Sequence, residues 1–429
     1  MVLTPRNPNP KNTMRNHTLL AVRALLAATV LVVADDAASH PDVSTQRPAL
    51  RVGPVRRSPL PNVNPLKPVL GDPLPGLNKT QLALFAEGKD DFLHEEDVES
   101  GLGPIYNETS CVACHSSGAP GGGSARNVTR FGRTTNGVFD PLDALGGSLL
   151  QDQAISPGAI ELVPKEANTI VHRNSTPLFG LGLIDAIPDD AILKNVHKHP
   201  VDGVTGRPSW VTDVVSGKLK VGRFGWKAQQ ATLLAFAADA YRNEIGITNR
   251  YFPTENAPNG DASLLAKYDF VQDPEDAPAT GLADFEKVAN FMKYLAPAPG
   301  SPPNASAAMG AQIFSKVGCA VCHVPCMMTG ASSEKAFDHR PVSLYSDLLL
   351  HNMGALGDGV SQGDATELEM RTSPLWGLKY SAPYLHDGRA ATVDDAIKAH
   401  DGEGKVSRDR YLQLTPTQKK QLADFLMTL

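Results

Sequence analysis

Hydrophobic residues recur at helical spacing at the end of the chain and in an earlier segment. Residues 415–429 show the period of an amphipathic helix, and Thr415 is a suitable N-cap. The apolar positions of this helix are Leu422, Phe425, Leu426 and Leu429. Residues 309–318 predict a shorter helix that carries Phe314 on its apolar face and ends at Gly318. A third amphipathic helix is predicted over residues 282–295, before the Pro-rich stretch 296–303.

A weak internal repeat relates two parts of the chain. The string RNSTPLFGL at residues 173–181 recurs as RTSPLWGL at residues 371–378, and each copy is followed by a helix start, at 188–192 and at 393–397. The alternative is a chance likeness between two turn-rich segments. Because each copy also precedes a terminal amphipathic helix, the repeat divides the chain into two domains, at about 78–297 and 306–429.

The N-terminal pattern differs from the rest. Basic residues precede an apolar run from Ala24 to Ala34, and the run ends in small residues suited to cleavage, so residues 1–38 predict a signal peptide; Met14 is an alternative start. The run is short for a membrane span, although an uncleaved anchor stays open as the alternative. Residues 39–77 are rich in proline and predict an extended linker. We therefore expect a periplasmic or otherwise exported protein.

Composition and charge narrow the function classes. The 429 residues include 46 Asp and Glu against 40 Lys and Arg. This mildly acidic balance argues against nucleic acid as a partner. Proline and glycine are abundant, so long loops are expected between the helices.

Four of the five cysteines lie in two Cys-x-x-Cys-His strings, although export would favour scattered disulfides. The strings are Cys111, Cys114 and His115, and Cys319, Cys322 and His323. Two thiols one helical turn apart can add to the two vinyl groups of a haem, while the adjacent histidine reaches the iron. The strings therefore predict two covalently bound haem c groups.

Zinc knuckles, a redox-active dithiol and disulfides are the alternatives for these strings. Zinc would require the second cysteine pair close by, and a dithiol does not require the following histidine. Cys326 is left over and is expected to be a free thiol. A cytochrome c fold requires a first and a last helix that cross, which the segments 309–318 and 415–429 supply. The fold class is therefore mainly α, with two cytochrome c-like haem domains and long loops.

Several longer strings resemble the bacterial di-haem oxidoreductase family, which groups with the di-haem cytochrome c peroxidases and the MauG-type enzymes. They include GLGPIYNETSCVACH, RNSTPLFGLGLIDAIPD, SLYSDLLLHNMG and RTSPLWGLKYSAPYLHDGRAATVDDAI. The resemblance extends from about residue 77 to residue 429. It implies an enzyme that reduces hydrogen peroxide or a similar small oxidant, with electrons passed from the C-terminal to the N-terminal haem. Relatives often carry a cysteine after a Phe-Pro pair, whereas residues 251–257 of this chain have none.

The resemblance also implies further site residues. His400 takes the place of the second iron ligand at the C-terminal haem, with Met353 as the alternative, and histidine instead of methionine should lower the potential of that haem. At the N-terminal haem, His172 lies where the peroxidases place a removable distal histidine. Glu244 lies where they carry the catalytic acid and base. His386 lies in a family motif beside the relay haem.

The family further implies a calcium ion between the haems, for which Asn174, Ser381 and Pro383 are the matching ligands. Trp210 and Trp226 are candidates for an electron path between the haems, although most tryptophans of this kind are simply part of the core. A small soluble cytochrome or cupredoxin is expected as electron donor, and the sequence does not indicate the oligomeric state.

Three other functions stay open. An electron carrier would have both irons bound by two protein ligands. A MauG-like enzyme would oxidise residues of a partner protein, although such enzymes use tyrosine where this chain has His400. A thiol oxidoreductase would need a second cysteine beside Cys326.

Overall fold

The computed structural model describes residues 69–273 and 281–429. The predicted signal peptide and most of the predicted linker lie outside these residues. Contacts group the described residues into one compact unit. No helix in the two described stretches has the length and apolar character that crossing a bilayer requires.

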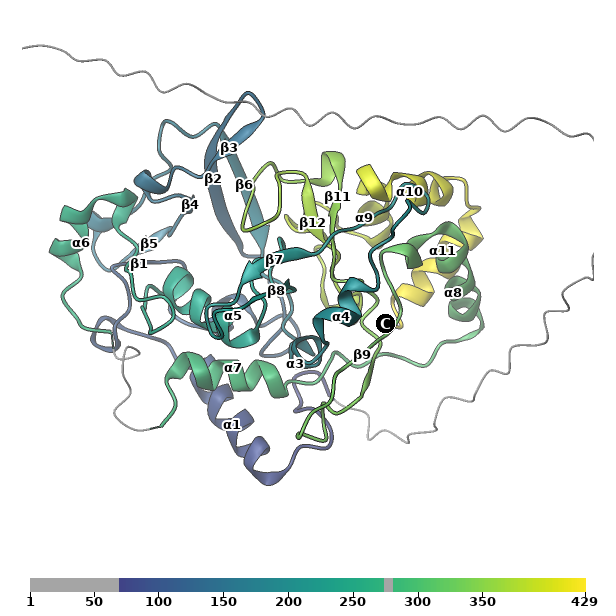
Figure 1. Ribbon diagram of the computed structural model, residues 1–429, viewed down its shortest axis with the longest axis horizontal. Helices are drawn as coiled ribbons and strands as arrows, with labels where there is room; N and C mark the ends of the chain where they lie inside the picture. The colour runs from purple at the N-terminus through teal and green to yellow at the C-terminus, as the bar shows by residue number, and fades with distance from the viewer. Residues whose placement is uncertain (1–68, 274–280) are drawn as a thin grey trace, which may run out of the picture. The chain divides into compact units, whose positions relative to one another are not determined.

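Helices supply most of the ordered secondary structure (Figure 1). They are α1 (Lys79–Leu93), α2 (Cys111–Cys114), α3 (Leu181–Asp185), α4 (Asp189–Leu193), α5 (Leu233–Ala240), α6 (Ala262–Tyr268), α7 (Asp284–Tyr294), α8 (Ala305–Val317), α9 (Val393–Ala399), α10 (Lys405–Leu412) and α11 (Pro416–Leu426). Short 3-10 turns and long loops join them. The loops agree with the abundance of proline and glycine.

The strands are short and pair antiparallel. They are β1 (Ile105–Tyr106), β2 (Asn127–Thr135), β3 (Val138–Asp140), β4 (Ser148–Leu149), β5 (Gln153–Ala154), β6 (Thr169–Asn174), β7 (Ser209–Thr212), β8 (Leu219–Gly222), β9 (Met327–Met328), β10 (Pro341–Val342), β11 (Leu350–Asn352) and β12 (Glu369–Arg371). The longest strand, β2, pairs with β3, β4 and β6. The expectation of a mainly helical chain did not include this β2–β6 sheet.

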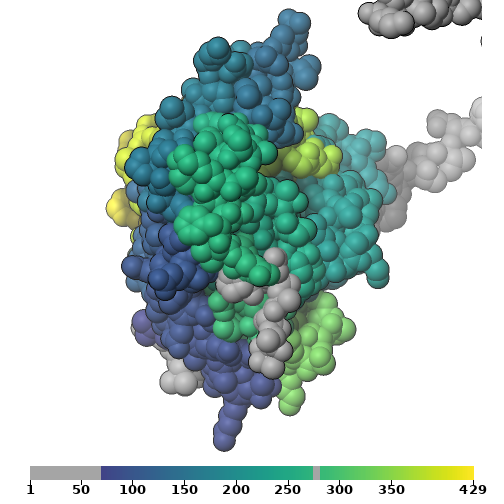
Figure 2. Space-filling view, turned by 90° about the vertical axis from the view of Figure 1, so that its left-hand side faces the viewer, coloured from purple at the N-terminus to yellow at the C-terminus, as the bar shows by residue number. Residues whose placement is uncertain are grey.

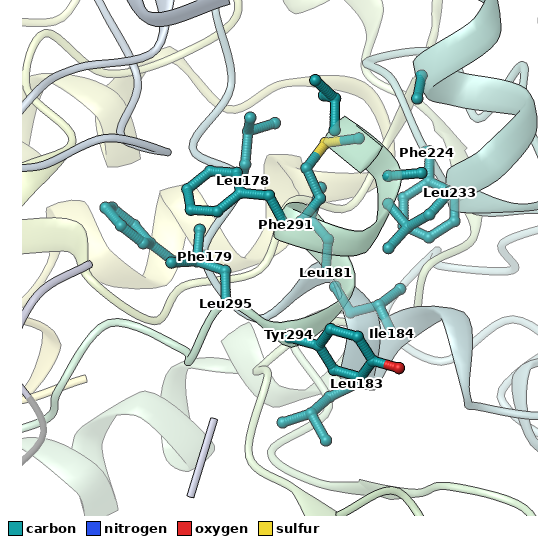
Figure 3. Packing of buried hydrophobic residues seen from close by; sticks show 14 of the residues in the cluster. Leu178, Phe179, Leu181, Leu183, Ile184, Phe224, Leu233, Phe291, Tyr294 and Leu295 are labelled. Atoms are coloured by element: carbon teal, nitrogen blue, oxygen red, sulfur yellow. The ribbon is translucent and has the colours of Figure 1, made fainter. Parts of the chain in front are cut away.

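The larger hydrophobic core forms where α1 and α7 pack together. Phe92 of α1 and Phe291 of α7 are fully buried, with ring centroids 4.7 Å apart. Gly88 allows close contact, because a Cβ there would lie 2.0 Å from the carbonyl oxygen of Lys287. Figure 3 shows Leu178 and Phe179 beside Phe291 in this core. The core thus fixes the segment that follows β6.

The smaller core joins α8 to α11. Phe314 and Phe425 are buried with ring centroids 5.4 Å apart. As predicted, Gly318 ends α8 in the left-handed region with φ of 103°. Thr415 is the N-cap of α11 and forms a capping box with Gln418. This helix pair is the crossing that the sequence predicts.

The two copies of the internal repeat adopt similar local structures. Arg173 and Asn174 end β6, and Gly180 then starts α3 with φ of 75°. Arg371 ends β12, and Gly377 then starts a 3-10 turn with φ of 75°. The repeat is therefore a strand end followed by a left-handed glycine and a helical turn.

The segment that carries α6 and the end of the predicted linker both pack on the N-terminal half of the chain. Figure 2 shows the green segment that carries α6 against blue segments of that half. The backbone N–H of Asn259 donates to the carboxylate of Glu161 at 2.8 Å across this contact. The last residues of the predicted linker also lie on the body, because Leu74 is buried and its N–H donates to the carbonyl oxygen of Tyr294 at 2.7 Å.

Candidate functional site

The first Cys-x-x-Cys-His string lies on a cavity of about 170 Å³. Helix α2 places Cys111 and Cys114 one turn apart, and His115 follows as the C-cap. The Nδ1 of His115 lies 3.2 Å from the carbonyl oxygen of Gly122, which leaves Nε2 as the ring nitrogen without that bond. Burial lowers the pKa of His115 to about 4, so the ring is neutral and suited to bind a metal ion.

Glu244 lines the same cavity as His115. It lies in a π-helical turn, Tyr241–Ile245, which continues α5 and ends at Gly246 with φ of 77°. A Cβ on Gly246 would lie 2.5 Å from the carbonyl oxygen of Ile105, so this turn closes tightly on β1. The Asn107 amide donates to the Glu244 carboxylate at 2.7 Å. Burial nevertheless raises the pKa of Glu244, as an acid and base near neutral pH requires.

The second string lies on a cavity of about 300 Å³ that His323 and His400 both line. Helix α8 positions the string, and α9 ends at His400. The Nδ1 of His323 lies 3.0 Å from the carbonyl oxygen of Tyr345, and that of His400 lies 2.8 Å from the carbonyl oxygen of Ala396. Both rings are therefore held by Nδ1. Burial lowers the pKa of both.

The two rings have the spacing of a pair that shares one metal ion. Their centroids are 6.5 Å apart. Two imidazoles that bind one ion from opposite sides have centroids on the order of 6 Å apart, because each nitrogen lies about 2 Å from the ion. The thiols of Cys319 and Cys322 line the same cavity. The residues present thus fit an iron porphyrin with His323 and His400 as its two ligands, while Met353 lines the cavity beside them.

The thiols do not have the character of a reactive dithiol. Burial raises the pKa of Cys111 to about 12, that of Cys114 to about 11 and that of Cys319 to about 12. Reactive cysteines have a lowered pKa instead. All five cysteines are free, and Cys326 is exposed.

Cys322 also belongs to a cluster with Asp347 and His351. The His351 ring lies between two carboxylates, with Nε2 2.9 Å from Asp347 and Nδ1 2.8 Å from Glu403. Burial alone would lower the pKa of His351, but these hydrogen bonds raise it to about 12. A protonated imidazole has no free lone pair for a metal ion. The cluster is therefore a hydrogen-bonded part of the wall of the larger cavity.

The structure does not bring His172 to His115. His172 lies on β6, where alternate side chains face opposite sides of the sheet. Arg173 and Asn174 are buried, whereas His172 is exposed and its Nδ1 contacts the Thr129 hydroxyl at 3.3 Å. His172 is not among the residues that line either cavity.

The two tryptophan candidates differ sharply. Trp226 lines both cavities, and its ring lies edge-on to that of His386 at 6.2 Å between centroids. Trp210 lies on β7, is 42% exposed and lines neither cavity. Of these two tryptophans, Trp226 is therefore the one that lies between the two cavities.

The three predicted calcium ligands come from distant segments to the edge of the larger cavity. The Asn174 amide nitrogen lies 3.3 Å from the carbonyl oxygen of Pro383, and Ser381 lines the cavity close by in the chain. The side-chain oxygen of Asn174 is buried without a hydrogen-bond partner among the described residues. An unpaired buried oxygen is costly unless something binds it.

Sequence reasoning missed two charged residues that line the smaller cavity, and a third, Asp358, that pairs with the lining residue Arg173. Arg130 of β2 and Asp239 of α5 line it beside Glu244. Asp358 accepts from the Arg173 guanidinium at 2.7 Å and from the Lys227 ammonium at 3.0 Å. A pairing of strands that lie far apart in sequence brings Arg130 and Arg173 together, and no local motif signals it.

A family model described as "Di-haem oxidoreductase, putative peroxidase" matches residues 156–429, well over half of the chain. No curated protein matches. The matched range includes the second string, both copies of the repeat and Glu244. The first string lies before it.

Solved structures also resemble the chain. The hydrazine synthase of Kuenenia stuttgartiensis has 17% identity and a TM-score of 0.38, over 91% of this chain and 100% of that one. A MauG-like protein associated with microbial copper homeostasis has 15% identity and a TM-score of 0.38, over 87% and 95%. The diheme peroxidase BthA from Burkholderia thailandensis has 13% identity and a TM-score of 0.37, over 81% and 86%. Because these TM-scores are low, the family model alone carries the assignment.

Proposed function

This chain belongs to the di-haem oxidoreductase family, so it is an oxidoreductase with two haem cofactors, and on that premise we propose that it reduces hydrogen peroxide. The reaction takes place in the cavity of His115 and Glu244. Electrons reach it one at a time through the cavity of His323 and His400. The two Cys-x-x-Cys-His strings attach the haems by thioether bonds.

The observation that carries this proposal is the asymmetry of the two cavities. Two histidines face each other across the larger cavity. Within the described residues, His115 is the sole histidine lining the smaller cavity, and a carboxyl group lines it as well. A centre with two fixed protein ligands suits electron transfer, whereas a centre with one ligand keeps a position for a small substrate.

The residues of the smaller cavity suit proton transfer to peroxide. Cys111, Cys114 and His115 would hold a haem there, which would supply the binding of peroxide oxygen and the electron exchange. Glu244 takes the proton from the near oxygen and returns it to the far one, which makes that oxygen a water leaving group. The Asn107 amide holds the carboxylate in place at 2.7 Å. The Arg130 guanidinium stabilises negative charge that develops on the oxygens.

Trp226 is the proposed electron path between the centres. It lines both cavities, and its indole N–H donates to Asn174, a residue that also lines both. A calcium ion bound by Asn174, Ser381 and Pro383 would lie at the same junction. Its support is the unpaired Asn174 oxygen, because calcium prefers oxygen ligands.

Export and the electron donor are part of the proposal. The basic and apolar pattern of residues 1–38 supports export. A small soluble cytochrome or cupredoxin would then deliver electrons to the larger cavity.

Spectroscopy on the purified protein tests the proposal. We expect two haems per chain by pyridine haemochrome, one low-spin centre, and one centre that reacts with peroxide in some redox state. Glu244→Gln should lower peroxide turnover by about 10²–10⁴-fold, the range of a lost acid and base. Glu166→Gln, an exposed change outside both cavities, should not. Two low-spin centres inert to peroxide would instead identify an electron carrier.

A further inference from the structure

Besides Glu244, two carboxyl residues line the smaller cavity: Glu108, which pairs with Arg126 at 2.6 Å, and Asp239, which lies five residues before Glu244. In a regular α-helix two residues five apart point to different sides. Here α5 passes into the π-helical turn Tyr241–Ile245, whose wider winding brings such residues toward one side. Because π turns occur mostly at functional sites, this turn indicates a function for Asp239.

The contacts of Asp239 leave it able to carry a proton. The Asn243 amide donates to one carboxylate oxygen at 2.8 Å, and the Gln230 side chain also hydrogen-bonds to the group. The ion pairs of the described residues do not include Asp239, and the nearby Arg126 pairs with Glu108 and Asp152 instead. Burial therefore outweighs these bonds and raises the pKa of Asp239. A raised pKa favours the neutral acid in this cavity.

The charged groups around Asp239 come from two elements. Arg130 faces it from β2, while Arg242 and Glu244 lie on its own helix and turn. The Arg130 Nη1 donates to the Ser148 hydroxyl at 3.2 Å, and its Nε is buried without a partner among the described residues. Arg130 thus favours one negative charge in the cavity, and Glu244 and Asp239 repel each other when both are ionised.

Peroxide reduction requires more protons than Glu244 can move. One hydrogen peroxide, two electrons and two protons give two waters, and the donor supplies the electrons. Glu244 only shifts a proton that peroxide already carries. Two further protons must therefore enter the cavity from outside.

We propose that Asp239 is a second catalytic acid of this cavity: after the O–O bond has broken, it gives the remaining oxygen two protons in turn, regains one from solvent each time, and the donor supplies the two electrons. The role rests on the proposed peroxide reduction. The two carboxyl groups thus divide the work: Glu244 acts before bond cleavage, and Asp239 acts after it.

Steady-state kinetics of the full-length protein with hydrogen peroxide and a one-electron dye test this division. We expect Asp239→Asn to lower kcat at least tenfold while kcat/KM for peroxide stays within twofold, because kcat/KM reports only the steps up to bond cleavage. Glu244→Gln should lower both parameters. Asp239→Glu should restore most of kcat and shift its pH profile. Asp90→Asn, an exposed change, should match the wild type.

Two results would overturn the inference alone. One is a kcat and pH profile of Asp239→Asn that match the wild type. The other is an equal loss of kcat and kcat/KM that Asp239→Glu does not restore, which would mean that Asp239 only supports the turn. The Soret spectrum of each variant checks that both haems are retained. Wild-type protein without peroxide turnover would overturn the proposed function, and this inference with it.

Discussion

Trp226 donates its indole N–H to the carbonyl oxygen of Asn174 at 2.9 Å, and its own carbonyl oxygen accepts from the Arg371 N–H at 2.9 Å. Asn174 belongs to the first copy of the repeat and Arg371 to the second. The first copy therefore holds the indole and the second holds the backbone of Trp226, at the junction of the two cavities.

Trp226→Phe should slow electron transfer between the centres. Phenylalanine keeps an aromatic ring but loses the bond to Asn174 and is harder to oxidise than tryptophan. We expect steady-state peroxide turnover to fall about tenfold, on the order of 1.4 kcal/mol in the barrier. Stopped-flow reduction of the C-terminal haem by the donor should keep its rate. Trp210→Phe is the matched control, and equal activity of the two variants would contradict the path.

His400→Met should raise the midpoint potential of the C-terminal haem. Methionine donates less electron density to iron than imidazole does, and axial ligands set haem potentials over roughly 0.8 V. We expect an increase on the order of 0.1–0.3 V in a spectroelectrochemical titration. His172→Ala should leave both potentials and the EPR spectrum unchanged, because His172 is exposed on β6. A spectral change in His172→Ala would restore it as a ligand.

Calcium removal should lower peroxide turnover, because the proposed ion lies at the junction of the two cavities. A calcium-selective chelator should lower peroxide turnover severalfold, and added Ca²⁺ should restore it better than Mg²⁺, whose smaller ion needs a stricter geometry. Asn174→Ala should be impaired from the start and insensitive to the chelator. Equal activity with and without the chelator, together with no calcium by elemental analysis, would exclude the site.

The raised pKa of Glu161 should make the free energy of unfolding depend on pH. Burial raises the pKa of Glu161 to about 7 from 4.5, although the backbone N–H groups of Gln151 and Asn259 donate to it. A raised carboxyl pKa means that the folded state binds the extra proton. Its contribution is therefore complete below pH 4.5 and lost as pH rises to 7, up to about 3 kcal/mol.

Urea unfolding at pH 4.5 and pH 8 measures this contribution. Glu161→Gln should remove that part of the pH dependence, since an amide does not titrate. Glu166→Gln, exposed in the same loop, should retain it. Identical pH dependence in wild type and Glu161→Gln would contradict the assignment.

Gly310→Ala should destabilise the crossing of α8 and α11. A Cβ at Gly310 would lie 2.0 Å from the carbonyl oxygen of Gln421, so the helices must separate. We expect a loss of about 1–3 kcal/mol in the free energy of unfolding. Ser315→Ala, on the exposed side of α8, should have little effect in the same thermal melt. An unchanged melting temperature for Gly310→Ala would mean that the helices adjust freely.

Local signals made part of the fold and site predictable. Gly318 and Thr415 end and start their helices as expected, because capping depends on residues close in the chain. The two Cys-x-x-Cys-His strings are also local, and each lies on its own cavity. Helical periodicity likewise located α7 and α11.

The remaining parts depend on contacts that local patterns do not contain. The exposed position of His172 follows from the pairing of β6 with β2, which begins more than forty residues earlier in the chain. The neighbourhood of Asp239 and Glu244 follows from a π-helical turn, which a search at helical period does not detect. Arg130 reaches the cavity through the same sheet. Long-range strand pairing and one π-helical turn therefore explain what the sequence alone does not predict.

Asp358 links the two domains that the internal repeat predicts, about 78–297 and 306–429. It lies in the C-terminal half, is 8% exposed, and holds both Arg173 and Lys227 from the N-terminal half. Loss of either half would leave unpaired buried charge, which costs about 3–5 kcal/mol. Neither half of the chain can therefore unfold alone without this free-energy penalty. Calorimetry should record one cooperative unfolding transition. Limited proteolysis should accordingly yield no stable fragment that contains only one of the two Cys-x-x-Cys-His strings.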